Sequence, residues 1–314
     1  MLIFLVRIAY ATMFWTFVLF LLKTILRLGR LLSVFIGKFF VQLNIAYNGL
    51  SNSSELQTHI CATNLLDKLA IMDLYQFSAS MMESDVSLGE FQRVINNYSH
   101  IAVARRKLDG SLRGMILVKV ENGELDGKKY NLMTMGLCLV HQQYRNGPFI
   151  PGASLFFYLR ELILHPFTPL LVIGKSFSLH SYLVLVKNFK EHYPRMDKET
   201  PAWEKKIMSN FGKQWETDQE RFNEATGVIE RERTKLRSHI VPISTKDLTN
   251  PHTAFYCTQN PGWRKGHCMV QMGKFTWIDV LLLGKKIIYR SLGIKSNCSK
   301  LKCKQLAPPR TLDP

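Results

Sequence analysis

The middle of the chain alternates apolar and polar positions in a way that predicts a meander of strands. Apolar segments at 100–106 and 112–120 flank Asp109-Gly110, a pair that supplies the positive φ of a tight turn. A second turn is expected within 122–127, and the segment 130–140 after it is almost continuously apolar. Such a segment is typical of a strand that is covered on both faces.

The pattern then changes to one of helices alternating with strands. Residues 141–153 break regular structure with glycine and proline, and 154–164 have the mixed apolar pattern of a mostly buried helix. A short buried strand is expected at 169–174 and a further helix at 178–189.

Two helices are expected before the meander. The first has apolar residues at helical spacing between Asn64, a candidate N-cap, and Tyr75. The second should run over 88–96, because Ser87 and Glu90 have the Ser/Thr-x-x-Glu spacing of a capping box.

This order of elements resembles the GNAT (Gcn5-related N-acetyltransferase) fold over roughly residues 65–195. The resemblance implies an α/β (α+β) domain whose mixed, mostly antiparallel sheet is flanked by helices. It also implies that acetyl-CoA or another acyl-CoA is a substrate, and that the acyl group passes to an amine. The identity of the amine acceptor is left open.

In that family, the loop after the fourth strand presents backbone N–H groups at a helix N-terminus to the pyrophosphate of acyl-CoA. The corresponding positions in this chain are Tyr144, Arg145, Asn146 and Gly147. The same loop contains Pro148 and Pro151, which have no N–H to offer.

The resemblance also implies roles in catalysis. Tyr182 matches the helix tyrosine that protonates the departing thiolate, and the backbone of Leu137 to Leu139 lies where two strands part and an N–H meets the thioester carbonyl. No Asp or Glu lies between 130 and 140, so His141 is the candidate base. The alternative is a non-catalytic GNAT-like binding or scaffold protein at a membrane, in which Tyr182 is simply a core residue.

The first 22 residues are apolar apart from Arg7 and are followed by a cluster that begins at Lys23. About 20 apolar residues cross a bilayer, so a single transmembrane helix is predicted, with a cleaved signal peptide as the rival interpretation. The apolar stretch 31–47 is either a second pass or an amphipathic helix on the membrane surface. Because the basic residues follow the first span, the main domain is expected to face the cytoplasm.

The chain divides into segments at changes in composition. Trp203, Ile207, Phe211 and Trp215 recur at helical spacing in a highly charged region, which favours a long amphipathic helix. The expected parts are a membrane anchor (1–47), a linker (48–63), the GNAT-like domain (64–200), the amphipathic helix (201–240), an appended hairpin and helix (241–294) and a basic tail (295–314).

The formal charge of +17 favours anionic partners, namely phospholipid headgroups, nucleic acid or a polyphosphate such as coenzyme A. Nucleic acid is the weakest of these, because no recognisable nucleic-acid module is present. Two further sites are alternatives. His192 and Asp197 have the His-x4-Asp spacing of glycerolipid acyltransferases. A zinc site lacks any Cys-x-x-Cys pair and would need His252, Cys257, His267 and Cys268.

Overall fold

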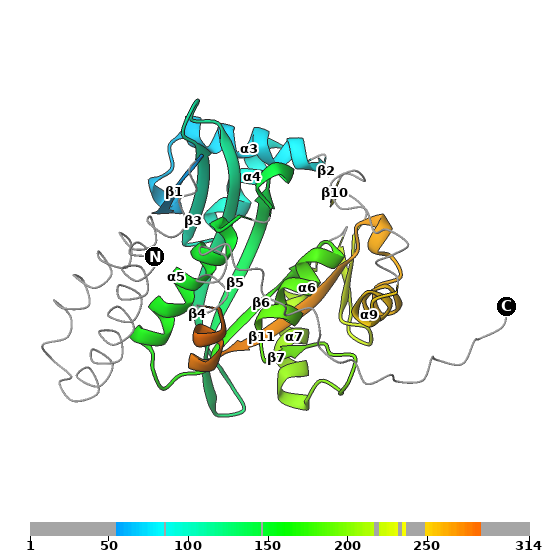
Figure 1. Cartoon of the computed structure of the whole chain (residues 1–314). Coiled ribbons are helices and arrows are strands. Elements are labelled where there is room, and N and C mark those ends of the chain that lie inside the picture. Colours follow the sequence, from blue (N-terminus) through cyan, green and yellow to red (C-terminus); the bar gives the residue numbers. More distant parts are fainter. Residues whose placement is uncertain are drawn as a thin grey trace, which may run out of the picture. The chain divides into compact units, whose positions relative to one another are not determined.

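The computed structural model describes residues 55–84, 86–145, 147–216, 220–231, 234–236 and 249–283 (Figure 1). The first part contains β1 (Leu56–Ala62), η1 (Thr63–Leu65), α3 (Lys68–Met81), β2 (Met82–Ser84), α4 (Leu88–Asn96), β3 (His100–Arg106), β4 (Leu112–Leu125) and β5 (Lys128–Val140). The second contains η2 (Gln142–Tyr144), α5 (Phe149–Leu164), β6 (Leu170–Ser176), α6 (Leu179–Asn188), β7 (Glu191–Tyr193), α7 (Ala202–Lys213), β8 (Glu220–Asn223), β9 (Val228–Arg231), β10 (Thr234–Leu236), α9 (Pro251–Gln259), η3 (Trp263–Lys265) and β11 (Cys268–Phe275).

One mixed sheet organises these elements. Its strand order is β1-β3-β4-β5-β6-β11-β9-β8, and β7 pairs with β11 at the side. All of its pairs are antiparallel except β5 with β6, which is parallel. The mixed, mostly antiparallel sheet flanked by helices that the sequence predicts is therefore confirmed.

The meander forms where the turn residues predict it. Asp126 and Gly127, with φ of 53° and 74°, connect β4 to β5, and Gly110 has a φ of 70° in the turn before β4. Gly123, expected in a turn, instead lies within β4, where a Cβ atom would stand 2.4 Å from the ring of Tyr130.

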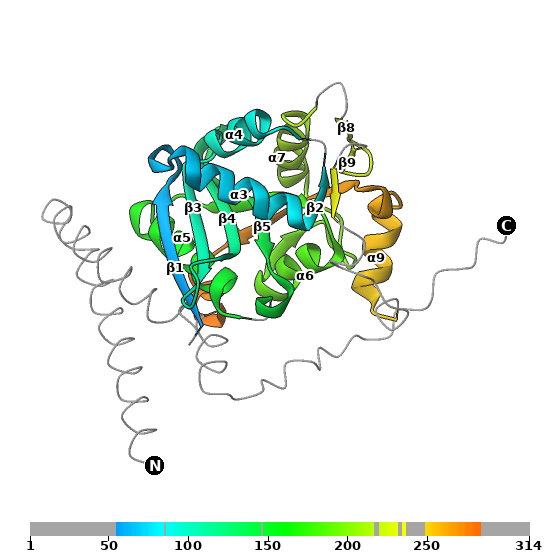
Figure 2. The ribbon, with the colours of Figure 1, turned by 90° about the horizontal axis from the view of Figure 1, so that it is seen from above.

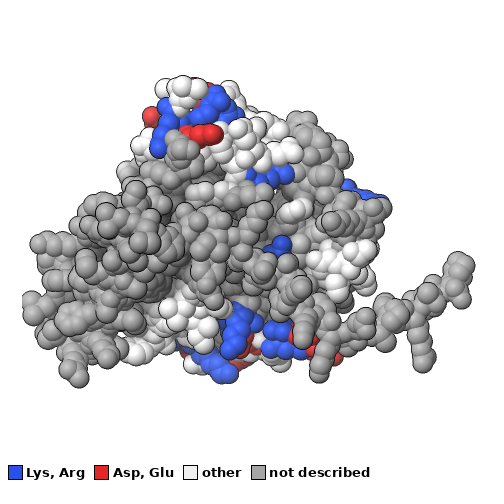
Figure 3. All heavy atoms as spheres, in the orientation of Figure 1, with Lys and Arg blue, Asp and Glu red and all other residues white. Residues whose placement is uncertain are grey.

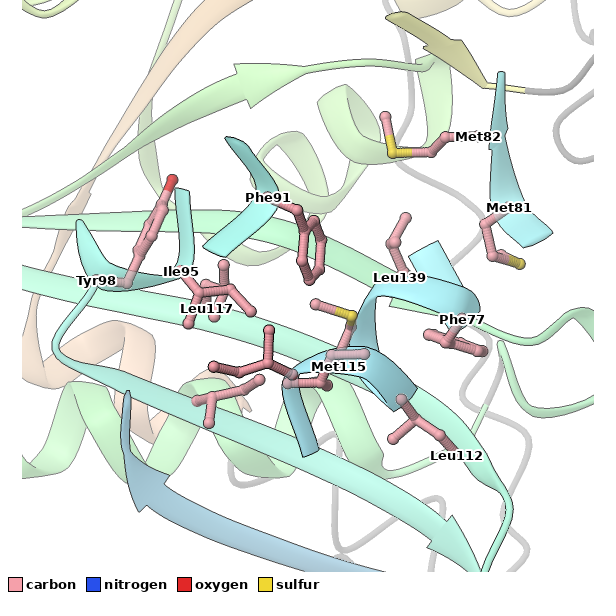
Figure 4. Close-up of a cluster of buried hydrophobic side chains, with 13 residues drawn as sticks. Phe77, Met81, Met82, Phe91, Ile95, Tyr98, Leu112, Met115, Leu117 and Leu139 are labelled. Atoms are coloured by element: carbon pink, nitrogen blue, oxygen red, sulfur yellow. The ribbon is translucent and has the colours of Figure 1, made fainter. Parts of the chain in front are cut away.

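Helices cover both faces of the sheet. On one face, α3 and α4 pack against β3, β4 and β5 in a cluster that includes Phe91, Ile95 and Met115 (Figure 4), and α7 packs farther along on β6 and β11. On the other face, α5 places Phe149 against Gly114, while α6 and α9 pack around Met269. Figure 2 shows α3 lying across the strands from β3 to β5.

The starts of the two helices before the meander differ in how well the sequence predicts them. The capping box of Ser87 and Glu90 is present at α4, as predicted. The cap of α3 is Asp67, which accepts a hydrogen bond from Ala70 N at 2.8 Å, and Asn64 lies in the preceding η1 turn. The prediction of Asn64 as the cap was wrong, because a second polar residue three positions on has the required geometry.

Two predicted boundaries differ from the structure. The expected linker 48–63 contains β1, which pairs along its whole length with β3. The expected long helix 201–240 ends at Lys213, and the chain then turns into β8 and β9. Within α7, Gly212 leaves room for Phe222 on β8, and a Cβ there would lie 2.4 Å from the Phe222 ring. Phe222 thus packs β8 against α7 and does not continue the apolar face of a longer helix.

The predicted C-terminal hairpin and helix are not appended to the domain. Residues 251–259, expected in the hairpin, form α9, and β11 inserts next to β6 with Phe275 opposite Leu170 and Met269 opposite Ser176. The sheet therefore continues beyond Arg195, where the resemblance to the family was expected to end.

No described helix is both long and apolar enough to cross a bilayer. The predicted anchor at 1–47 and the basic tail at 295–314 lie outside the described residues.

Candidate functional site

The two parallel strands at the centre of the sheet are paired along only part of their length. Their register runs from Asn131 opposite Leu170 to Thr134 opposite Ile173 and then stops. Beyond that point β5 stays with β4 and β6 stays with β11, so the sheet divides into two halves that Figure 1 shows running in different directions. We call this opening, between residues 135–140 and 174–176, the fork. The sequence-based prediction that these strands part is met.

The edge of β5 in the fork is irregular. Leu137 has a φ of 44°, and the register with β4 shifts so that Ile116 lies opposite both Leu137 and Cys138. This is a β-bulge, which locally frees and redirects backbone groups. Leu137 and Leu139 turn their side chains toward the α3 and α4 cluster and away from the plane of the sheet.

Cys138 lies on β5 within the fork. The protein around it raises the pKa of its thiol to about 12, and yet the residue is exposed to solvent. Cys138 affects the pKa of Tyr98 and of Tyr158, which come from opposite faces of the sheet.

Positive charge gathers at the end of β5. His141 N donates a hydrogen bond to Arg113 O at 2.8 Å, and Arg145 Nε donates one to Val140 O at 3.3 Å. Burial, together with Arg113 and Arg145, lowers the pKa of His141, so its ring is neutral at pH 7. The Nε of Arg113 and the Nδ1 of His141 are buried without a hydrogen-bond partner.

The N-terminus of α5 follows this cluster. Pro148 is its N-cap residue, and the first turn closes with Gly152 N donating to Pro148 O at 2.8 Å. Because Pro151 has no N–H, only Phe149 and Ile150 have backbone donors left at this end. Tyr144 and Gly147 form the turn before the helix, with Gly147 N donating to Tyr144 O at 3.0 Å. Asn146 lies outside the described residues.

Tyr182 lies in a different environment from the other predicted site residues. It is on α6, its ring stacks on Tyr256 of α9 at 5.6 Å, and its hydroxyl is buried without a partner. Burial raises its pKa, and the nearby charges that act on it are Asp197 and Arg195, on the loop after β7. The structure brings His141, Tyr144 and Arg145 together at the end of β5, and it places Tyr182 against α9.

The alternative sites gain no support. Arg195 Nε donates to Asp197 Oδ1 at 2.7 Å, and His192 Nδ1 lies 3.2 Å from Phe189 O, so no hydrogen bond joins His192 to Asp197. Within the described part of the chain, no group of three or more His, Cys, Asp or Glu side chains is placed to hold a metal ion.

The surface charge in the described part is mixed. Figure 3 shows basic side chains beside acidic ones at the top and bottom of one face, with no continuous basic stripe among the residues described there. Much of the charge of +17 belongs to the ends of the sequence: five Lys or Arg and no acidic residue in 1–54, and eight with one Asp in 284–314.

Searches with the sequence find no relative. No protein-family model matches it. No curated protein matches it either.

Solved structures that resemble this chain are N-acetyltransferases of the GNAT family and related acyltransferases. Yeast (Saccharomyces cerevisiae) N-myristoyltransferase with bound myristoyl-CoA is 13% identical, over 39% of this chain and 31% of that one, with a TM-score of 0.31. Glucosamine-6-phosphate N-acetyltransferase of Arabidopsis thaliana is 15% identical, over 46% and 99%, with a TM-score of 0.32. A GNAT-family N-acetyltransferase of Escherichia coli in complex with CoA is 13% identical, over 44% and 72%, with a TM-score of 0.31. The match spans about a third of the length of the yeast enzyme. This likeness concerns the fold alone.

Three residues near the fork were not predicted from the sequence. Arg113 reaches it because β4 pairs with β5, and Tyr98 because α4 ends above β5. Ser176, at the end of β6, has a fully buried hydroxyl without a partner. Each lies in an ordinary strand or helix pattern, so only the pairing of distant segments identifies it.

Proposed function

We propose that the chain binds an acyl-CoA thioester in the fork and transfers its acyl group to an amine. The observation that carries this proposal is the end of pairing between β5 and β6 after Thr134 and Ile173, because strands that stop pairing leave backbone groups available in the middle of the sheet, beside the exposed Cys138. A second strand alongside would fill these positions in an ordinary sheet.

The polar groups around the fork suit the two ends of such a ligand. Arg113, Arg145 and the N-terminus of α5 offer positive charge and N–H donors for phosphates. The bulge at Leu137 and Cys138 offers backbone to the thioester carbonyl. His141, which stays neutral, is suited to take a proton from the amine, directly or through water.

Binding is the first test. Calorimetric titration of the full chain with acetyl-CoA and with octanoyl-CoA should give saturable binding, and Arg113→Gln and Arg145→Gln should each weaken it by about tenfold or more, since a charge-assisted bond contributes about 1.5–3 kcal/mol. Arg221→Gln is the matched control, because Arg221 is exposed on β8 at the far edge of the sheet and should have no effect. Absence of binding at millimolar ligand would refute the proposal.

A non-catalytic binding protein is the second candidate. No Asp or Glu lies on β5, and Pro148 and Pro151 reduce the donors at the α5 N-terminus, which favours binding without turnover. Release of free thiol from acetyl-CoA in the presence of amines separates the two. Binding without any thiol release would select the non-catalytic candidate.

Attachment to a membrane is a separate proposal that rests on the sequence of residues 1–47 alone. The apolar length and the basic flank support a single span with the domain on the cytoplasmic side. Resistance of the full chain to extraction by alkaline carbonate tests it. Release into the soluble fraction would count against the anchor.

A further inference from the structure

Tyr98 reaches the fork from the face that α3 and α4 cover. It follows α4, its ring belongs to the buried cluster of that face, and only 7% of the residue is exposed. Its hydroxyl oxygen lies 2.1 Å from where a Cβ atom on Gly136 would stand. Gly136 is two residues beyond Thr134, the last residue of β5 that pairs with β6. The missing side chain at Gly136 is therefore what lets the hydroxyl approach the backbone of β5 just beyond the last residue that pairs with β6.

Within the described part of the protein, no hydrogen bond is formed by the Tyr98 hydroxyl. Figure 4 shows the Tyr98 oxygen directed away from the other labelled side chains of the cluster. On the opposite face, the Tyr158 hydroxyl already has a partner in Met135 Sδ, 3.3 Å away. Of the two tyrosines whose pKa Cys138 affects, Tyr98 is the one whose hydroxyl makes no hydrogen bond with the described residues.

The protonation state of Tyr98 suits a donor. Burial, and to a lesser extent Cys138, raises its pKa above the usual value, so the hydroxyl keeps its proton throughout the physiological range. The backbone at Leu137 and Cys138 lies one and two residues further along the same edge. A carbonyl oxygen placed beside the bulge would therefore meet a side-chain donor as well as backbone.

We propose that the Tyr98 hydroxyl donates a hydrogen bond to the thioester carbonyl oxygen and is a catalytic residue of the transfer, which rests on the function proposed above. The amine nitrogen attacks the carbonyl carbon, a C–N bond forms, and the oxygen gains the negative charge that Tyr98 stabilises. The C–S bond then breaks as the carbonyl re-forms. The proton lost from nitrogen ends on the sulfur of coenzyme A, so the products are an amide and the free thiol.

This assignment differs from the one that the sequence suggests. Tyr182 matches the family position, but its ring packs against Tyr256 and its hydroxyl is influenced by Arg195 and Asp197, whereas Cys138 is the group that influences Tyr98. The two assignments concern different atoms, the carbonyl oxygen for Tyr98 and the leaving sulfur for Tyr182, so each variant tests its own role.

The experiment compares Tyr98→Phe with Tyr182→Phe in the full chain. Dissociation constants for acetyl-CoA are measured by calorimetry, and kcat by release of free thiol from acetyl-CoA with an amine mixture of spermidine and a lysine-containing peptide. Tyr98→Phe should bind acetyl-CoA within twofold of the wild type while kcat falls about 100-fold, the usual effect of removing one oxyanion donor. Tyr182→Phe is measured alongside as the test of the separate role at the leaving sulfur.

A kcat for Tyr98→Phe within threefold of the wild type would overturn the inference. A fall in kcat that occurs in Tyr182→Phe and not in Tyr98→Phe would do the same. If the wild type binds no acetyl-CoA, the proposed function itself fails, and this is seen before any variant is made. Tyr75→Phe is the matched control, since Tyr75 packs on Phe91 in the same cluster but donates to Val86 O at 3.0 Å, away from β5. It should lose some stability and no turnover.

Discussion

The paired and the parted halves of β5 and β6 are built from the same two strands and differ in almost every physical respect. In the paired half, Met133, Leu171 and Ile173 are at most 1% exposed and face apolar neighbours on both sides of the sheet. In the parted half, the chain has a bulge, a residue with φ of 44° and an exposed thiol. Buried polar groups without partners, such as Ser176, also lie there.

The difference separates what stabilises this protein from what can act chemically. Apolar burial and ladder hydrogen bonds contribute stability in the paired half. Unpaired backbone and unsatisfied polar groups cost stability in the parted half, and such costs persist where a ligand makes use of them. Substitutions in the two halves should therefore affect different measurements.

The largest expected effect is on stability in the paired half. Leu171→Ala removes a side chain that is 0% exposed and leaves a cavity between β6 and α7, so the free energy of unfolding should fall by about 2–5 kcal/mol. Urea unfolding measures it. Leu108→Ala is the control, because Leu108 is 86% exposed and should change stability by less than about 0.5 kcal/mol. Equal effects of the two would remove the distinction between the halves.

A smaller effect is expected where the fork begins. Gly136→Ala places a methyl group against the Tyr98 hydroxyl, so the free energy of unfolding should fall by about 1–3 kcal/mol. Gly89→Ala is the matched control, since nothing lies within 4 Å of a Cβ there and Gly89 is in α4, where alanine is favoured by up to about 1 kcal/mol. A neutral Gly136→Ala would mean that Tyr98 moves away at little cost.

The sequence predicts local elements well because their causes are local. The turn at Asp126-Gly127, the capping box at Ser87 and the start of α6 after Ser178 each depend on residues within a few positions. By contrast, the sequence predicts a linker where β1 lies and half of a hairpin where β11 lies, because each of these strands is stabilised by a strand far away in the sequence. Local periodicity contains no information about that partner.

The absence of information about distant partners also explains which residues of the candidate site the sequence can predict. His141 and Arg145 follow β5 directly, so the resemblance to a family can mark them. Arg113 and Tyr98 enter the fork through pairing and packing with distant segments, and their own surroundings in the sequence are those of an ordinary strand and helix end. The long helix predicted over 201–240 was wrong for a related reason, because Phe222 contacts α7 from β8 across Gly212.

Acidification should weaken the folded protein before the carboxylates titrate. The pKa values of four histidines are lowered, in each case chiefly by burial: His100, His141, His192 and His252. The unfolded chain therefore binds more protons below its ordinary histidine pKa of about 6.5, and stability is lost as the pH falls through 6.5 and on through the lowered values. Each unit of lowering contributes about 1.4 kcal/mol. Glu161, whose pKa burial raises, acts in the opposite direction but is a single group.

Urea midpoints between pH 7.5 and 5.5 measure this dependence. His141→Gln removes the contribution of the histidine near the fork to the pH dependence of stability. The plot of urea midpoint against pH should therefore be flatter for the variant than for the wild type. Stability that is constant over this range would show that the histidines are solvated in solution.

The smallest expected effect compares a buried hydroxyl that has no partner with one that forms a hydrogen bond, by their effects on the free energy of unfolding. Ser176 has a hydroxyl that is fully buried, has no partner and lies at the end of β6 in the fork. Ser176→Ala should leave the free energy of unfolding unchanged or raise it by up to about 1 kcal/mol, because an unsatisfied polar group is removed from a buried position. Ser99→Ala removes a hydroxyl that donates to Val118 O at 3.1 Å and should lower stability by about 1 kcal/mol. If Ser176→Ala also weakens acetyl-CoA binding while stability rises, the hydroxyl belongs to the ligand site. It would then lower the stability of the free protein and contribute to ligand binding, as expected of polar groups in the parted half of the sheet. A loss of stability equal to that of Ser99→Ala would show that the Ser176 hydroxyl finds a hydrogen-bond partner in solution. Ser176 would then no longer count among the unsatisfied polar groups of the parted half.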